Sequence, residues 1–413
     1  MSKRNILLLA GAGLLVLAFV LYQVPAINSR LSWRFEVART YVKNVLNPVG
    51  SVPTAIPSTP YPTVPASPTV VQQVTPALAD ATAVLVTPTL APPPAQAVIN
   101  SPPYEKQTAN NCGPAALSMM LRIFGWTGDQ KIISDVIKPV NGDRNVNPEE
   151  MAFWIRNYAG WLRVEYRVGG DLDTLKRLIA ASYPVIIEGT TSLNPDDTGW
   201  PDDDLWAAHY LLLTGYDDVT QTFIAQDPYK GPDKIISYEQ VLSEWKPFNY
   251  VYMIVYLPED EAEIATLLGS NWDPGLNRLN ALAIAEAATV NDPTDAFAWF
   301  NVGSNLVYFE RYNEANVAYD KARELGLPQR MFRYQFGPFL ANFHAQRTDD
   351  LLALTEYALQ RTEMSEETWL WHGWALYRSG NTPKAVESWR KALSIRPGYE
   401  DALYALSFVG ASP

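Results

Sequence analysis

The stretch YEKQTANNCGPAALSMMLRIFGW, Tyr104 to Trp126, contains Cys112, the only cysteine among 413 residues. Pro114 follows closely, and apolar residues then recur at helical spacing. Because proline suits the first turn of a helix, this pattern predicts a helix that begins at or just after Cys112. The helix dipole and the free N–H groups there would stabilise a thiolate, so we predict a nucleophile. A small buried packing residue is the alternative role for a lone cysteine.

The whole-chain composition is that of a globular protein with excess acid. The hydrophobic content is 47%, the formal net charge is −12 and the pI is about 4.8. Nucleic acid is not expected as the main partner, because phosphate binding needs a basic surface. One cysteine can form neither an internal disulfide nor a metal site with several thiolates. Only His209, His344 and His372 remain as histidine ligands, so we expect no metal and no cofactor.

Residues 1–27 carry an uncharged apolar run from Ile6 to Val24, preceded by Lys3 and Arg4. As a helix this run would span roughly 28 Å, which matches the hydrocarbon core of a bilayer. The basic residues before it favour an N-terminus on the inside. We therefore predict a single-pass anchor in the cell membrane that places the rest of the chain outside the cytoplasm. Cleavage after VPA, which ends at Ala26, would instead make it a signal peptide and the protein secreted.

Residues 28–103 begin with a short amphipathic stretch and continue as a linker dominated by Pro, Thr, Ser, Ala and Val. Such a composition cannot build a hydrophobic core. Closely spaced prolines favour extended conformations, so the segment is predicted to be a semi-rigid stalk, with a plain disordered linker as the alternative. Both interpretations place a domain boundary near Pro103.

Residues 104–258 are predicted to form an α+β domain with one helix-forming run followed by short strands. Four runs rich in β-branched and aromatic residues are flanked by turn residues, and this pattern predicts strands. These runs are Pro184–Thr190, His209–Tyr216, Thr222–Gln226 and Tyr250–Leu257.

His209 is the only histidine of this domain, and it begins one of the predicted strands. If this strand pairs with the next as an antiparallel hairpin centred on Asp218, His209 lies opposite Asp227 and on the same face of the sheet. A register slip of one residue would place them on opposite faces. Asp227 would then orient His209 as the base for Cys112. Asp217 and Asp218 are alternative orienting residues, although their turn positions favour solvation.

Acyl transfer also needs a hydrogen-bond donor for the tetrahedral oxyanion. Gln107 lies in the loop before Cys112. Its side-chain amide could share this role with the backbone N–H of Cys112. Asn110 and Asn111 are closer to the thiol but are expected to be turn or capping residues.

The blocks QTANNCGPA, HYLLLTGYDD and QDPY, in this order, resemble peptidase family thirty-nine of the papain-like cysteine peptidases. The resemblance covers about Tyr104 to Pro258. It implies a papain-like α+β fold in which Gln107 lies at the oxyanion hole, Cys112 is the nucleophile, His209 the base and Asp227 the orienting residue. The best-known members of that family cut bacteriocin leader peptides after a double glycine. This chain shows a predicted anchor and helical repeats instead of an exporter, so the leader specificity is not carried over.

The run NPDDTGWPDDDLW, Asn194 to Trp206, carries five aspartates just before His209. A solvated surface loop is the prediction for this composition. Selection of basic substrates, calcium binding and covering of the cleft are the alternatives.

Residues 259–413 are rich in Ala, Leu and Glu and repeat themselves with a shift of 70 residues, about two 34-residue units. The repeated positions resemble the tetratricopeptide repeat, with Gly303 and Gly373 at the expected close helix crossings. The resemblance implies an all-α solenoid whose concave surface binds a peptide or a partner protein. A structural cap on the neighbouring domain is the alternative. His344 and His372 are expected to be packing or surface residues of these helices.

Together these features predict a papain-like cysteine peptidase domain, an all-α tetratricopeptide-repeat solenoid and an N-terminal transmembrane helix. The expected activity is hydrolysis of amide bonds in a peptide or protein substrate through an acyl-enzyme. Transfer of the acyl group to another acceptor remains open. The alternative from another class is a scaffold protein whose papain-like domain holds a peptide without cutting it.

Overall fold

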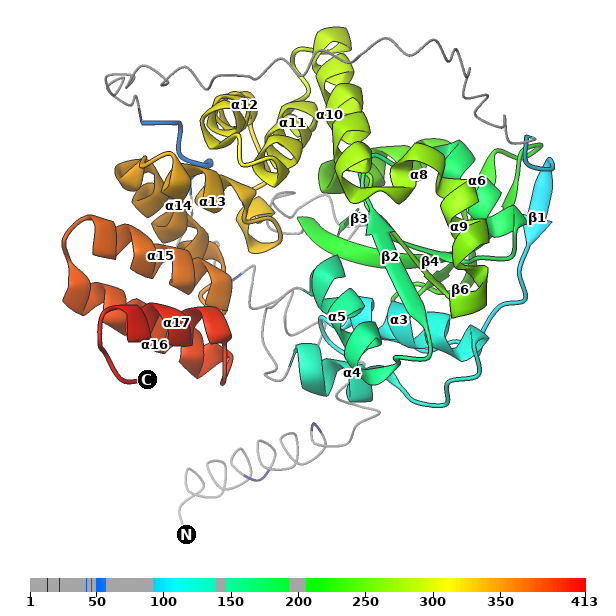
Figure 1. The fold of residues 1–413 in the computed structure, drawn as a ribbon, viewed down its shortest axis with the longest axis horizontal. Helices are drawn as coiled ribbons and strands as arrows, with labels where there is room; N and C mark the ends of the chain where they lie inside the picture. The colour runs from blue at the N-terminus through cyan, green and yellow to red at the C-terminus, as the bar shows by residue number, and fades with distance from the viewer. Residues whose placement is uncertain are drawn as a thin grey trace, which may run out of the picture.

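The computed structural model describes residues 50–56, 92–138, 146–192 and 206–413, together with the single residues Gly13, Tyr22, Val42 and Leu46. In this part of the chain an α+β domain built around one sheet is followed by a large helical region (Figure 1). The predicted membrane run Ile6–Val24, most of the linker and nearly all of the aspartate-rich run Asn194–Trp206 lie outside the described residues. Among the described residues, no helix is long and apolar enough to cross a bilayer.

Seven strands form one antiparallel sheet in the order β2-β7-β3-β4-β5-β6, and β1 pairs with the end of β4. Strands β3, β4, β5 and β7 confirm the four predicted runs, whereas β1, β2 and β6 are additional. Because β1 precedes Pro103, the sheet begins before the boundary predicted there. The bounds are β1 Gln96–Val98, β2 Arg163–Arg167, β3 Val185–Ser192, β4 Trp206–Asp217, β5 Thr222–Asp227, β6 Gly231–Ser237 and β7 Tyr252–Tyr256.

Helices cover both faces of the sheet, and each face has its own hydrophobic core. The expectation of a single helix-forming run is therefore wrong. Short polar residues cap the additional helices: Asp129 accepts hydrogen bonds from the backbone of α4, Asp171 from α6 and Ser237 from α8. These caps are the sequence signal that could have revealed them. One face carries α3 Cys112–Ile123, α4 Gln130–Ile137 and α5 Pro148–Tyr158; the other carries α6 Leu172–Ala180, α8 Tyr238–Trp245 and α9 Glu261–Leu268.

The C-terminal region is a succession of helices in which neighbours pack against each other (Figure 1). A Cβ atom at Gly303 would lie 2.6 Å from the ring of Tyr319, and one at Gly373 would lie 2.3 Å from Nε1 of Trp389. Only glycine fits at these two crossings, as their shared sequence pattern predicts. The helices are α10 Pro274–Asn291, α11 Ala296–Tyr308, α12 Tyr312–Leu325, α13 Gly337–His344, α14 Thr348–Arg361, α15 Glu366–Arg378, α16 Thr382–Ile395 and α17 Glu400–Phe408.

The helical region packs on the sheet domain at several points along its length. Lys246, just after α8, pairs with Asp295 at 2.7 Å, and Asn249 exchanges side-chain hydrogen bonds with Asn305. Gln335 donates to the carbonyl of Pro247 at 2.6 Å. Towards the C-terminus, Arg396 pairs with Glu150 of α5 at 3.1 Å. These contacts agree with the alternative in which the helices cap the neighbouring domain.

Residues 50–56, from the linker that precedes the sheet domain, pack on the helical region. Val52 is buried within the core of α10–α15. Arg323 of α12 donates to the carbonyl of Pro53 at 2.8 Å, and the hydroxyl of Tyr357 of α14 donates to the carbonyl of Gly50 at 3.2 Å. This part of the linker is therefore held on the helices.

Substitution Val52→Ala is expected to lower the free energy of unfolding by about 2 kcal/mol, because it removes buried methyl groups. The measurement is a urea denaturation curve in which tryptophan fluorescence monitors unfolding. Val52 is 5% exposed and Ile56 is 41% exposed, so Ile56→Ala serves as the matched control from the same segment. Equal effects of the two substitutions would show that the segment does not dock through Val52.

Candidate active site

Cys112 is the first residue of α3, as the sequence predicts, and its side chain is partly exposed. Burial raises the pKa of the Cys112 thiol, whereas its contacts with the imidazole of His209 and the backbone of Tyr210 lower it. The charges of His209 and Lys138 act in the same direction, so the net pKa lies below the usual value. A lowered thiol pKa is what a reactive cysteine requires.

His209 and Asp227 form a buried pair in which Nε2 of the imidazole lies 2.8 Å from Oδ1 of the carboxylate. Burial lowers the pKa of His209, but the hydrogen bonds to Asp227 and Cys112 raise it to about 10. Burial likewise raises the pKa of Asp227, whereas His209 and the backbone N–H groups of Tyr229 and Lys230 lower it below its usual value. With Nε2 held by the carboxylate, Nδ1 is the nitrogen left to face the thiol.

The hairpin register differs from the predicted one, although the predicted contact forms. Strands β4 and β5 pair as Tyr216 with Phe223 near the turn and as Leu212 with Gln226 further on, with a bulge between Leu213 and Gly215. The hairpin is therefore not centred on Asp218. If the pairing near the turn continued without the bulge, Asp227 would lie opposite Leu212. Its side chain would then be on the face of the sheet opposite to that of His209. The extra residue of the bulge moves Asp227 to the face of His209.

Gln107 lies beside this pair because its backbone N–H donates to the carbonyl of Pro228 at 2.9 Å. The hydroxyl of Tyr104 donates to the carbonyls of Asp227 and Pro228, both at 3.1 Å. The loop before α3 is thereby attached to the turn that carries Asp227. The side-chain amide of Gln107 makes no hydrogen bond to another described residue, and its Oε1 is buried. It is available for a substrate oxygen once the loop is in place.

The other predicted candidates lie elsewhere. Asp217 accepts hydrogen bonds from the backbone of Val219 and Thr220, and the carboxylate of Asp218 contacts Lys176 and Tyr238. Neither aspartate replaces Asp227 as the partner of His209. In the helical region, His344 stacks on Tyr312 at 4.3 Å and Nδ1 of His372 lies 3.0 Å from Oγ of Ser388. Both histidines pack within the helices, as expected.

The arrangement of a helix-terminal thiol, a buried imidazole and a carboxylate on one sheet agrees with a comparison to known families. Residues 98–253 match the Peptidase_C39 like family model. This C39-like domain has the papain-like α+β fold. No curated protein matches the chain.

Several solved structures are similar to a part of this chain. A Bacillus anthracis protein described as a C39-like peptidase has 19% identity and a TM-score of 0.32, and the match covers 39% of this chain and 97% of that one. A double glycine motif protease from an AMS/PCAT transporter, solved with its leader peptide, has 19% identity, a TM-score of 0.28 and coverages of 39% and 98%. YrrB, a TPR protein with an unusual peptide-binding site, has 21% identity, a TM-score of 0.20 and coverages of 36% and 90%.

A buried polar network, which the sequence did not reveal, fixes the loop of the C39-like domain before Cys112. Oε1 of Gln130 accepts from the backbone of Thr108 at 2.8 Å and from Nδ2 of Asn111 at 2.9 Å. Nε2 of Gln130 donates to Glu105 at 2.9 Å and to the carbonyl of Lys106 at 2.8 Å. A buried, fully used amide of this kind specifies one loop conformation.

Lys138 is a second residue that the sequence did not reveal. It is buried and its Nζ donates to the carbonyl of Asn110, next to the loop before α3. Gln130 lies on α4 and Lys138 at its C-terminal end, and both contact a loop that is distant in the sequence. Neither residue therefore belongs to a sequence motif. Their role depends on packing between segments and has no local signal.

Substitution Gln130→Leu is expected to lower kcat for a cleaved peptide about 10-fold or more, because the loop that carries Gln107 loses its fixed position. The alkylation pKa of Cys112 should stay unchanged, because Gln130 contacts neither the thiol nor His209. Gln240→Leu is the matched control, since Gln240 lies on the exposed surface of α8. A shifted thiol pKa at unchanged kcat would contradict this positioning role.

Proposed function

We propose that the C39-like domain is a cysteine peptidase that hydrolyses peptide bonds through an acyl-enzyme on Cys112. The observation that carries this proposal is that Cys112 interacts with His209, whose ring is held by Asp227 at 2.8 Å. These interactions lower the pKa of the thiol and raise that of the imidazole to about 10. Between these two pKa values the pair is a thiolate and an imidazolium. This is the resting state that a thiol nucleophile needs.

In the first step the Cys112 thiolate attacks the carbonyl carbon of the substrate, and the carbonyl oxygen takes the negative charge. The backbone N–H of Cys112 has no intrahelical acceptor at the start of α3, and together with the amide of Gln107 it can donate to this oxyanion. The His209 imidazolium then gives its proton to the leaving amine, the C–N bond breaks and a thioester remains. Asp227 keeps the ring orientated throughout.

In the second step neutral His209 takes a proton from water, and the hydroxide attacks the thioester carbonyl. The tetrahedral intermediate releases the Cys112 thiolate and a carboxylic acid, while the imidazolium is restored. The resting ion pair is thereby regenerated without a cofactor. An amine in place of water would give transfer instead of hydrolysis.

The test uses a randomised peptide library incubated with the full chain in detergent, followed by mass spectrometry of the products. We expect new cleavage products with the parent and none with Cys112→Ala, since loss of the nucleophile leaves only residual catalysis. Added hydroxylamine should divert part of the acyl group to a hydroxamate. Products that persist in Cys112→Ala would overturn the proposal, and binding without any products would favour the scaffold alternative.

The repeats and the N-terminal segment complete the proposal. The repeated glycine crossings support a tetratricopeptide-type solenoid that recruits a protein partner or substrate. The apolar run Ile6–Val24 supports a single membrane anchor with the peptidase domain outside the cytoplasm. Membrane fractionation of cells that express the full chain, with and without residues 1–27, tests the anchor.

A further inference from the structure

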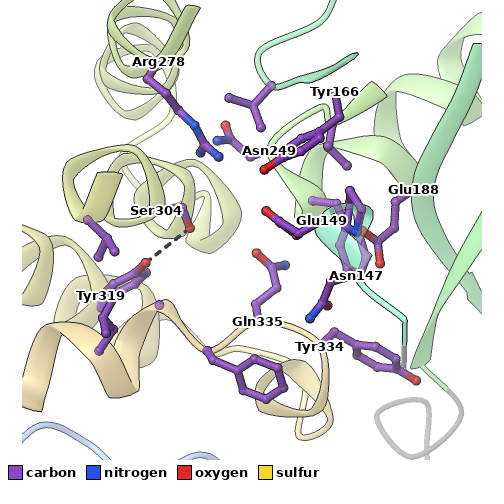
Figure 2. Close-up of a pocket in the computed structure, with 18 of the residues that line it drawn as sticks. Asn147, Glu149, Tyr166, Glu188, Asn249, Arg278, Ser304, Tyr319, Tyr334 and Gln335 are labelled. Atoms are coloured by element: carbon purple, nitrogen blue, oxygen red, sulfur yellow. Dashed lines mark hydrogen bonds between the residues drawn. The ribbon is translucent and has the colours of Figure 1, made fainter. Parts of the chain in front are cut away.

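A cavity of about 350 Å³ lies between the C39-like domain and the helical region (Figure 2). Tyr166 of β2 and Glu188 of β3 contribute to one wall, and Arg278 of α10 and Trp371 of α15 to the other. None of Cys112, His209 and Asp227 lines it. Its volume is in the range of sites for small ligands.

Arg278 is the cationic group of this cavity, and its guanidinium lacks an anionic partner in contact. Within the described residues it forms no ion pair, and its single hydrogen bond, to Oδ1 of Asn305, is 3.5 Å long. The guanidinium also lies over the ring of Tyr308 at 5.1 Å. Burial lowers the pKa of Arg278 despite the opposing charge of Glu149. A guanidinium has five donors, so most of its hydrogen-bonding capacity is unused here.

Carboxylates provide the opposite charge on the other wall. The carboxylate of Glu149, at the start of α5, lies near Tyr166, and that of the buried Glu188 lies near Tyr210; after burial, these charges are the main cause that raises the pKa of each tyrosine. Figure 2 shows Arg278 and Glu188 on different sides of the space, with Glu149 between them. Two carboxylates would repel a purely anionic ligand. The cavity therefore suits a molecule that carries an anionic end and a cationic end.

Polar amides and aromatic rings fill the remaining surface. Asn249 and Gln335 point into the space in Figure 2. Asn249 of the C39-like domain also donates to Asn305 of the helical region, and Gln335 of the helical region donates to the carbonyl of Pro247. Phe336 and Trp371 add apolar surface on the helical side. Amides recognise peptide groups and aromatic rings pack on side chains, so the lining matches a short peptide better than an inorganic ion.

We propose that this cavity binds a short peptide with free termini, whose carboxylate pairs with Arg278 and whose ammonium group lies among Glu149 and Glu188. Arginine suits the carboxylate because it can donate two parallel hydrogen bonds. The ligand would contact both domains and hold the helical region on the C39-like domain. This site is separate from the proposed peptidase site and does not depend on cleavage.

The test uses the full chain with Cys112→Ala in detergent, so that no peptide is consumed. Three equimolar tripeptide pools are compared by thermal unfolding and by calorimetric titration: one with free termini, one amidated at the C-terminus and one acetylated at the N-terminus. We expect the free pool to raise the unfolding temperature and each blocked pool to bind at least 10-fold more weakly. Equal binding of free and blocked pools, or no binding of the free pool, would overturn the proposal.

Arg278→Gln should weaken binding of the free pool at least 10-fold and leave the amidated pool little changed. Arg311→Gln is the matched control, because Arg311 lies on the exposed surface of the same region and pairs only with Glu314 among the described residues. Unchanged binding in Arg278→Gln would overturn the assignment. If that variant fails to fold, the comparison of pools in the parent still decides the question. Peptide binding without cleavage by the wild type would leave this site standing and remove the proposed activity.

Discussion

Substitution His209→Ala is expected to slow alkylation of Cys112 by iodoacetamide about 10- to 100-fold at pH 6.5. In the parent, the contact with His209 and its charge lower the thiol pKa, so a larger fraction of thiolate is present at this pH than in an ordinary thiol. Without the imidazole, a thiol with a pKa near 8.5 would be only about 1% ionised. The higher nucleophilicity of a more basic thiolate offsets part of this loss. Because the chain has one cysteine, the measured rate belongs to Cys112 alone.

The alkylation rate should be measured from pH 5 to pH 10 in both proteins. The parent should show thiolate reactivity at lower pH, and the variant should show a single ionisation at higher pH. His344→Ala is the control, since His344 packs on Tyr312 in the helical region. If the pH profile of alkylation is the same in the parent and in His209→Ala, the thiolate and imidazolium pair does not exist. The proposed peptidase mechanism would then be contradicted as well.

Substitution Asp227→Asn is expected to lower the free energy of unfolding by about 3 kcal/mol at pH 6, because it leaves the buried imidazolium without its carboxylate. The raised pKa of His209, about 10, stabilises the folded state fully below pH 6.5. This contribution is lost as the pH rises towards 10. The penalty of the substitution should therefore be less than half as large at pH 9.5. Urea denaturation at the two pH values measures the difference.

Asp217→Asn is the matched control for this experiment, because Asp217 accepts backbone hydrogen bonds in the turn between β4 and β5 and does not contact a histidine. Its effect on stability should be smaller and should not change between pH 6 and pH 9.5. A penalty for Asp227→Asn that stays constant over this range would contradict the charged pair. It would show that His209 is neutral in the folded protein.

The candidate site could be predicted to a large extent because its residues lie in short segments with strong local signals. Pro114 and the apolar periodicity locate the start of α3, and thereby the position of Cys112. The β-branched runs locate β4 and β5, which carry His209 and Asp227. Helices α4, α6 and α8 were missed although Asp129, Asp171 and Ser237 cap them. Their apolar faces are short, so helical periodicity alone gives a weak signal.

The hairpin register could not be predicted, although the contact it was meant to explain does form. A bulge near Thr214 adds one residue to β4 and changes which residues of β5 share a face with His209. Bulges arise where a strand must bend to fit its neighbours, and β4 pairs with β3, β5 and β1 along its length. The outcome therefore depends on the whole sheet and not on the two strands alone.

The sequence by itself determined where the candidate nucleophile lies, the strands that carry His209 and Asp227 and the presence of two differently built regions, because these follow from local pattern and spacing. Tertiary structure alone decided that Gln130 and Lys138 hold the loop before Cys112, that Val52 docks on the helices and that Arg278 faces carboxylates across a cavity. Each of these contacts joins segments far apart in the chain. Such contacts form only when packing of several elements places them together, so no local pattern records them.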